Sequence, residues 1–313
     1  MEVSLVISKL MPVILIIALG WVLKHTKLIT DDGSTLLKRL IVNVGLPSVF
    51  FLSFLKMSIT MSLIMFIPGM FLLNIVLLFV GKGAAKITGG KYSPFLFTGF
   101  EYGMFAIAVF TAAYGASSAS YIAILDVGHE LFIWFVFVTV ILATSNTKNT
   151  AGDTIRSFIK SPIIIAIVLG FAGNLLGLEQ IINSNPVLKG IETTISMLMS
   201  LTAPLILLSI GAGLSLSRLG LSFALKVTAI RLPIVLILIF LINKFVVRGL
   251  MGLPFAYEAA LFTLLIAPPP FIIPLYMSDK DTDEKGVINT TLTFYTIVSL
   301  VLFVVYFSFN PVL

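Results

Sequence analysis

The sequence predicts an all-α polytopic membrane protein of ten transmembrane helices, arranged as two inverted repeats of five. Three observations predict this fold. The 313 residues are 58% hydrophobic and only 11% charged, with a mean hydropathy of +1.12, whereas a soluble domain is about half apolar and about a quarter charged. Ten segments are apolar and long enough to cross a bilayer. Lysine and arginine are concentrated on one side of these segments.

A helix needs about 20 apolar residues to cross the hydrocarbon core. The ten segments are 5–23, 36–55, 59–81, 94–114, 119–142, 161–177, 190–211, 221–245, 254–277 and 287–309. The first lacks the basic start and small-residue cleavage site of a signal peptide, so we expect it to remain as a span. The longest polar loop, 143–160, is a predicted cytoplasmic linker between a first repeat, 1–142, and a second, 161–313.

Positive charges predict the orientation. Fourteen Lys and Arg residues fall on one side of the spans and five on the other, with Arg231 inside a span. Because cytoplasmic loops carry the excess of Lys and Arg, the richer side is cytoplasmic. Both termini then lie outside the cell membrane (the inner membrane, in a bacterium), and five spans per half invert the second repeat. The net charge of +6 therefore reflects topology rather than nucleic-acid binding.

Proline and glycine recur at matching places in the two halves. Each match alone is weak, because both residues are common in membrane helices, but they occur in the same order. The matched positions are Pro12 and Pro162, Gly20 and Gly170, and Pro94 and Pro254. Inverted repeats place a substrate site at their interface near the middle of the membrane.

The ninth span cannot be a continuous helix. The segment from Ala267 to Pro274 contains four prolines, Pro268, Pro269, Pro270 and Pro274, and each removes a backbone donor and clashes with the preceding turn. Lipid cannot replace the lost hydrogen bonds, so this backbone must face protein or an internal cavity. Broken helices of this kind form the substrate sites of many secondary transporters.

The fourth span holds the expected partner of this break. Gly99 and Gly103 flank Glu101, and they indicate either tight helix packing or a second interruption. An ionisable side chain at this depth is costly and marks function by default. Glu101 could serve as a proton site, a cation ligand or half of a buried ion pair. A substrate carboxylate could sit on the helix N-terminus that such a break exposes.

The fifth span carries Asp126, His129 and Glu130 on one helical face. They indicate either a structural network or a coupling site, and the candidates for proton coupling are Glu101, Asp126, His129 and Glu130. We expect no metal site, because the chain has no Cys and only two His, and no zinc motif follows His129.

Four further polar residues lie inside spans. Asn74 is expected to bond between helices, and Asn43 to lie near the cavity. Arg231 and Glu192 either reach an interface or pair with each other.

Two segments carry a resemblance to a known family. The first is Ala267-Pro268-Pro269, followed by Asp281 and the Thr-rich start of the tenth span. The second is the fourth span, where Glu101, Gly103 and Ala106 take the places of Asn, Gly and Gly in the pattern Asn-x-Gly-Phe-x-Gly-x-Pro, and Ala108 takes the place of Pro. Tyr114-Gly115 closes that segment. Over nearly its whole length, the chain resembles the auxin efflux carrier family, which includes the PIN-type transporters and many bacterial homologues.

The resemblance implies a scaffold domain of spans 1, 2, 6 and 7 and a transport domain of spans 3–5 and 8–10, with spans 4 and 9 crossing at broken centres. Relatives export carboxylate-bearing molecules by an elevator-like movement, and the fold is shared with the bile-acid sodium symporters. Glu101 in place of Asn departs from the family and favours proton coupling, because a carboxylate here repels an anion unless it is protonated or paired. The expected substrate-binding residues are Glu101, Tyr102, Gly103, Met104, Asn43, Pro268, Pro269 and Pro270.

The sequence thus predicts a secondary transporter of small organic acids, with efflux as the expected direction. The alternatives are a symporter coupled to sodium or protons and, from another class, a membrane sensor that binds a ligand without moving it. An enzyme is not expected, since we find no nucleophile elbow, phosphate loop or metal-ligand spacing. No cofactor is expected beyond coupling to H⁺ or Na⁺. The expected partners are the lipid bilayer and an organic acid, and the chain could form a homodimer.

Overall fold

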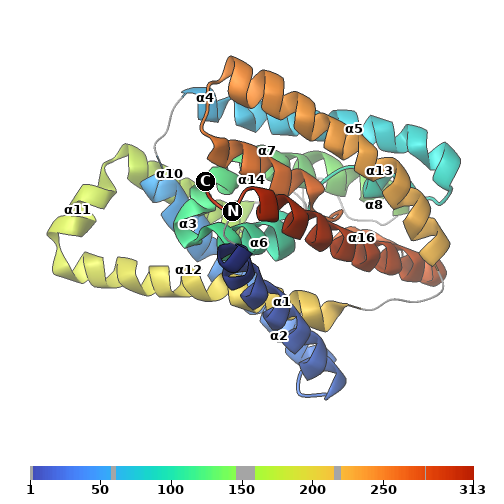
Figure 1. Ribbon diagram of the computed structural model, residues 1–313, viewed down its shortest axis with the longest axis horizontal. Coiled ribbons are helices and arrows are strands. Elements are labelled where there is room, and N and C mark those ends of the chain that lie inside the picture. The colour runs from blue at the N-terminus through green and yellow to red at the C-terminus, as the bar shows by residue number, and fades with distance from the viewer. Residues whose placement is uncertain (1–2, 58–60, 146–158, 215–219, 279) are drawn as a thin grey trace.

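The computed structural model describes residues 3–57, 61–145, 159–214, 220–278 and 280–313, as helices and turns without a β-strand (Figure 1). Seven of these helices are long and apolar enough to cross a membrane, and a bent pair brings the number to eight. Lengths and composition of this kind are those of a multi-pass helical membrane protein.

The first half contains three long helical segments, a broken one and another long one. The first three are α1 (Val3–His25), then α2 (Asp31–Leu40) continued by η1 (Ile41–Gly45) and α3 (Leu46–Lys56), then α4 (Met61–Ile64) with α5 (Phe66–Thr88). The broken segment is η2 (Ser93–Leu96), η3 (Tyr102–Ala106) and α6 (Ile107–Tyr114). The last is η4 (Ala116–Ser118), α7 (Ala119–Phe132), η5 (Ile133–Phe137) and α8 (Val138–Ser145). Most of the predicted linker 143–160 lies outside the described residues.

The second half repeats this order. It starts with α10 (Pro162–Leu175) and α11 (Leu178–Ser184), which are bent by 80°. Two long segments follow, α12 (Pro186–Gly213) and α13 (Leu221–Leu241) with η6 (Ile242–Leu250). A broken segment comes next, α14 (Phe255–Ile266) and α15 (Ile273–Tyr276), and then the long α16 (Thr282–Phe309).

The difference between ten predicted spans and seven or eight long helices lies in the fourth and ninth segments. Their longest apolar helices are Tyr102–Tyr114 and Phe255–Ile266, which are each too short to cross a bilayer alone. The first of these helices begins just after Gly99, and the second ends just before Pro268. The interruptions therefore occur where the sequence predicts them.

Two glycines allow helices from opposite halves to approach closely. A Cβ on Gly20 of α1 would meet the main-chain carbonyl group of Leu208 in α12. A Cβ on Gly170 of α10 would lie 2.6 Å from the carbonyl oxygen of Phe51 in α3. Backbones this close exclude any larger side chain, so these glycines explain why α1 packs on α12 and α10 packs on α3.

The two termini lie close together (Figure 1). The Lys9 ammonium donates a hydrogen bond to the Pro311 carbonyl oxygen at 3.3 Å, and the Tyr114 hydroxyl donates to the carbonyl oxygen of Asn310 at 2.8 Å. The end of α6 therefore shares an end of the bundle with both termini. The predicted topology likewise places all three on the outer side.

Turns from the two halves meet before η2 and before α16. The Tyr92 hydroxyl donates to Asp281 at 2.8 Å, and the Lys91 ammonium pairs with the same carboxylate at 3.3 Å. The hydrogen bond from Tyr92 lowers the pKa of the Asp281 carboxyl group below its usual value. Both turns fall on the side that the positive charges predict to be cytoplasmic.

Candidate functional site

The interruptions of the fourth and ninth segments lie against each other. Between η2 and η3 the chain leaves the helix at 97–101, and between α14 and α15 it does so at 267–272. The Glu101 N–H donates a hydrogen bond to the carbonyl oxygen of Pro268 at 2.8 Å. The interrupted fourth segment has no helical acceptor for this N–H, so the other break supplies one. A buried N–H group requires such a hydrogen-bond partner.

Gly99 and Pro270 explain the close contact between the breaks. Gly99 has φ +71°, a left-handed conformation that glycine adopts without steric cost. A Cβ at this position would lie 2.5 Å from Cγ of Pro270 and 3.0 Å from Cδ1 of Ile133. The first glycine of the predicted pair therefore serves both the turn and the approach of the second backbone.

The prolines end α14 as predicted. Ala267 follows the last residue of α14 with φ −55° and ψ 151°, which is the extended conformation that a following proline imposes. Pro268 and Pro269 have no N–H to donate, and the Pro268 carbonyl is the acceptor for Glu101. The extended link across 267–270 is thus set by local sequence.

The carboxylate of Glu101 binds both segments at their interruptions. Its Oε1 accepts a hydrogen bond from the Met104 N–H at 3.0 Å, and its Oε2 accepts one from the Phe271 N–H at 2.7 Å. These are the free amides at the start of η3 and just before α15, where an anion is favoured. The side chain of Glu101 therefore occupies the helix N-termini at the breaks, where a substrate carboxylate is expected from the sequence.

Arg231 of α13 donates hydrogen bonds to main-chain carbonyl groups at both breaks. Its guanidinium donates to the carbonyl oxygens of Leu96 at 2.7 Å, Gly99 at 3.0 Å and Ala267 at 3.3 Å. The side chain is 1% exposed, and the rings of Phe100 and Tyr295 lie 5.3 and 4.8 Å from it. Arg231 thus joins the ends of η2 and α14.

Arg231 was not among the predicted site residues. Neither alternative given for Arg231 holds: the residue is buried, and Glu192 forms ion pairs with Lys56 and Lys189 instead. The sequence signal that could have identified Arg231 as a site residue is its position as a single arginine within an apolar span. A charge at that depth must have partners inside the protein.

Asn74 of α5 fixes the fourth segment from a third side. Its Oδ1 accepts a hydrogen bond from the Gly99 N–H at 3.0 Å, and its main-chain oxygen accepts one from the Thr98 hydroxyl at 2.7 Å. Asn74 is fully buried. The predicted role of this amide in bonding between helices is confirmed.

A cavity of about 320 Å³ adjoins the breaks at Met104 and Phe271. Lys38 of α2 lines it together with polar residues of α16 and the last turns of α12. Ser209 of α12 also lines it; the residue is 2% exposed, and its hydroxyl has no hydrogen-bond partner in the described structure. A positive charge and a free buried hydroxyl suit a small anionic or polar solute.

A second cavity of about 260 Å³ lies between α1, α3, α6 and α12. Most of its lining is apolar, including Val13, Val49, Ile107 and Leu207. Both cavities thus lie where helices of the predicted scaffold meet the fourth segment, and the first also touches the ninth and tenth.

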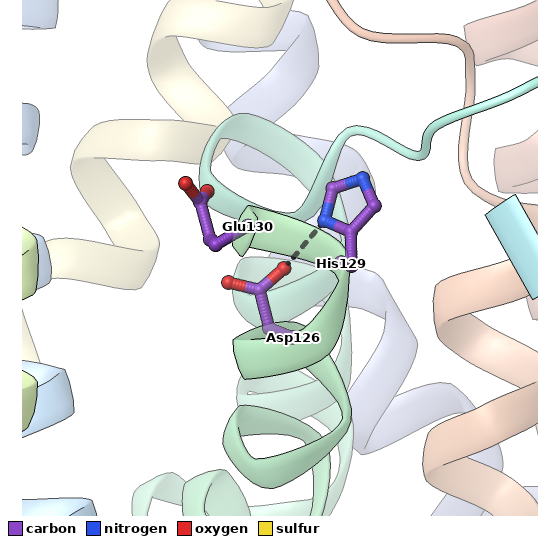
Figure 2. A group of neighbouring side chains, drawn as sticks. All are labelled: Asp126, His129 and Glu130. Atoms are coloured by element: carbon purple, nitrogen blue, oxygen red, sulfur yellow. Dashed lines mark hydrogen bonds and ion pairs between the residues drawn. The ribbon is translucent and has the colours of Figure 1, made fainter. Parts of the chain in front are cut away.

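The predicted group Asp126, His129 and Glu130 lies on α7 (Figure 2). Each residue offers a ligand atom, and these atoms lie within 4.8 Å of one another. His129 Nε2 accepts a hydrogen bond from the Phe100 N–H at 2.9 Å, so its Nδ1 carries the proton and donates to Asp126 at 2.8 Å. With both ring nitrogens engaged, His129 is neutral and is not free to bind a metal ion.

The structure brings some of the predicted substrate-binding residues together at the breaks. Glu101 bonds to Pro268 and Phe271 of the other break, and Met104 donates its N–H to Glu101. Tyr102 packs instead on Phe50, with ring centroids 5.3 Å apart, and a Cβ on Gly103 would lie 3.0 Å from the Leu46 side chain. Asn43 differs: it is exposed, and its amide donates to the Arg39 carbonyl oxygen of its own helical segment. Asn43 does not line either cavity described above.

The chain matches no family model and no curated protein sequence.

Proposed function

We propose that this protein is a secondary transporter of small organic acids, with alternating access at the crossing of the fourth and ninth segments. The observation that carries the proposal is the contact between two interrupted helices beside a cavity containing Lys38. Irregular backbone at membrane depth is tolerated where protein or a cavity surrounds it, and transporters place their substrates at such points.

The packing of the helices supports two inverted repeats. The first span of each half packs on the second span of the other half, as α1 on α12 and α10 on α3. The third and fifth spans pack within each half, as α5 with α7 and α13 with α16. Together with the paired breaks, this arrangement is the one expected of two copies of a five-span unit in opposite orientations.

Both cavities support an elevator-like movement. Spans 1, 2, 6 and 7 form the proposed scaffold, and spans 3–5 and 8–10 form the proposed transport domain. Each cavity is lined by helices from both domains, so a sliding movement of one against the other would change both. Membership of the auxin efflux carrier family, with both termini outside the cell membrane, is part of the same proposal.

The charge of Lys38 favours an anionic substrate. Glu101 already accepts the N–H groups at the break, and a second carboxylate there would meet like charge. Lys38 is exposed and lines the same cavity, so its ammonium offers an alternative partner through a charge-assisted hydrogen bond to a carboxylate. A small monocarboxylate therefore fits between Lys38 and the break.

Replacing Lys38 by methionine tests this function. In proteoliposomes, the KM for a transported organic acid should rise about 10- to 100-fold, because a hydrogen bond to a charged group is lost. Lys38→Arg should retain most of the affinity. Arg39→Met is the matched control, since it removes the neighbouring positive charge from a residue that does not line the cavity. Equal KM values for Lys38→Met and wild type would refute the anion site.

Replacing Glu101 by glutamine tests the bond between the breaks. The amide keeps one oxygen, so either the Met104 or the Phe271 N–H must face a donor. We expect the free energy of unfolding in detergent to fall by about 1 to 3 kcal/mol, the usual cost of an unsatisfied buried donor. Glu179→Gln, at an exposed position of α11, is the control. A variant as stable as wild type would contradict the double hydrogen bond.

A further inference from the structure

Two buried oxygen atoms beside the break lack hydrogen-bond partners in the described structure. They are Oδ2 of Asp126 and the hydroxyl of Tyr102. Asp126 is 0% exposed and Tyr102 is 2% exposed. An unpaired carboxylate oxygen in such a place is unfavourable, so an additional donor or cation is expected there.

The free oxygen of Asp126 lies near a second carboxylate. Glu130 is one helical turn further along α7, and ligand atoms of the two residues are within 4.8 Å. In Figure 2, the free oxygen of Asp126 lies on the side of α7 occupied by Glu130, and His129 lies on the other. Two carboxylates therefore lie together on α7, and the buried Tyr102 hydroxyl of the neighbouring η3 also lacks a partner.

The surrounding groups do not neutralise this pair. Glu130 accepts a hydrogen bond from the Trp134 indole N–H, and His129 is neutral. Among the described residues, no lysine or arginine forms an ion pair with Asp126 or Glu130. Other titratable groups lie on the segments around them. They are Glu101 before η3, Tyr114 of α6, Tyr121 of α7, Arg231 of α13, Tyr257 and Glu258 of α14, Lys56 of α3 and Lys82 and Lys86 of α5.

The buried charged groups among these have partners elsewhere, and Lys82 and Lys86 are exposed. Arg231 donates to main-chain carbonyl oxygens, and the carboxylate of Glu101 accepts two main-chain N–H groups. Glu258 pairs with Arg248, and Lys56 pairs with Glu192. Without a bound proton, Asp126 and Glu130 would therefore carry two adjacent negative charges.

We propose that Asp126 and Glu130 together hold one exchangeable proton beside Tyr102, and that this pair couples proton movement to transport. This inference rests on the proposed function. A single proton removes one of the two adjacent charges and supplies the missing donor, as in other pairs of close carboxylates. Two carboxylates offer too few oxygens for Ca²⁺, which takes about 6 to 8 oxygen ligands.

A short chain of hydrogen bonds links the pair to the break. Asp126 accepts from Nδ1 of His129, and Nε2 of His129 accepts from the Phe100 N–H. Phe100 directly precedes Glu101, whose N–H binds the Pro268 carbonyl. Loss of the proton places a negative charge two hydrogen bonds from the crossing, and this charge strengthens the hold of His129 on Phe100. The protonation state can thus alter the geometry of the break.

Infrared spectroscopy of the purified protein tests for the proton without any transport. At neutral pH, wild type should show the carbonyl band of a protonated carboxylic acid, and Asp126→Asn and Glu130→Gln should each lose or shift it. Asp283→Asn, at an exposed position, should leave it unchanged. Failure of both α7 variants to alter the band would overturn the proposal. Stabilisation by sodium over choline at constant ionic strength, lost in Asp126→Asn, would also overturn it in favour of a sodium ion.

Proteoliposomes test the coupling. An imposed pH gradient should change the rate of organic-acid uptake at least several-fold in wild type and not in Glu130→Gln, with passive entry of the acid measured in empty liposomes. Uptake that ignores the gradient in wild type would refute coupling while leaving the transporter function intact. A carboxylic acid band without transport of any organic acid would refute the proposed function but not the proton site.

Discussion

Arg231→Met is expected to cause the largest loss of stability of any single substitution at the breaks. The methionine side chain fills similar space but cannot donate, so the carbonyl groups of Leu96, Gly99 and Ala267 lose their common donor. We expect the free energy of unfolding to fall by about 3 to 5 kcal/mol, as when one partner of a buried charged interaction is removed. Thermal unfolding in detergent, monitored by size-exclusion chromatography, measures this loss.

Two variants control for the effect of charge. Arg231→Lys keeps a positive charge but not the planar array of donors, so its stability should lie between those of Arg231→Met and wild type. Arg248→Met removes an arginine whose partner Glu258 lies near the start of α14, at the opposite end of that helix from the break. Its melting temperature should fall less than that of Arg231→Met, because the Arg248 side chain is exposed although Glu258 is buried. Equal losses for Arg231→Met and Arg248→Met would contradict the role assigned to Arg231.

Gly99→Ala is expected to have the second largest effect. Alanine is strained at φ +71°, and its Cβ would lie 2.5 Å from Pro270, so the two breaks must separate. Backbone strain and overpacking together should cost about 2 to 5 kcal/mol. In proteoliposomes, we expect transport to be abolished even at temperatures where the variant remains folded, because the crossing is displaced.

Gly83→Ala is the matched control. Gly83 lies within α5, and a Cβ there would meet nothing within 4 Å. The substitution should be neutral or stabilising, because alanine favours the helix more than glycine does. If Gly99→Ala folds and transports like Gly83→Ala, the close approach of the two backbones would be refuted.

The positions of the breaks could be predicted because they depend on local chemistry. Prolines at 268–270 prevent a helix whatever surrounds them, and Gly99 favours a turn that other residues resist. Helical character could be predicted for the same reason, since apolar composition over about 20 residues is sufficient evidence. The bend between α10 and α11 was not predicted, although Gly177 at the bend has φ +67°.

The partners of the site residues could not be predicted. Every residue carries a carbonyl group, so nothing in the sequence indicates that Arg231 binds those of Leu96, Gly99 and Ala267. The two N–H partners of Glu101 are likewise main-chain groups brought near by folding. Asn43 shows the opposite error: its place beside a proline kink suggested the cavity, but a helix exposes each residue according to its rotational position.

The bonds made by Arg231 go to the main chain, and this affects how the protein can evolve. A guanidinium that binds carbonyl oxygens does not depend on which side chains Leu96 and Ala267 carry. Under the proposed function, neighbouring side chains can therefore change to suit a different solute while the hydrogen bonds between the segments are kept. Solute selectivity would then depend on side chains, whereas the stability of the crossing depends on main-chain groups. Substitutions could alter the first without weakening the second.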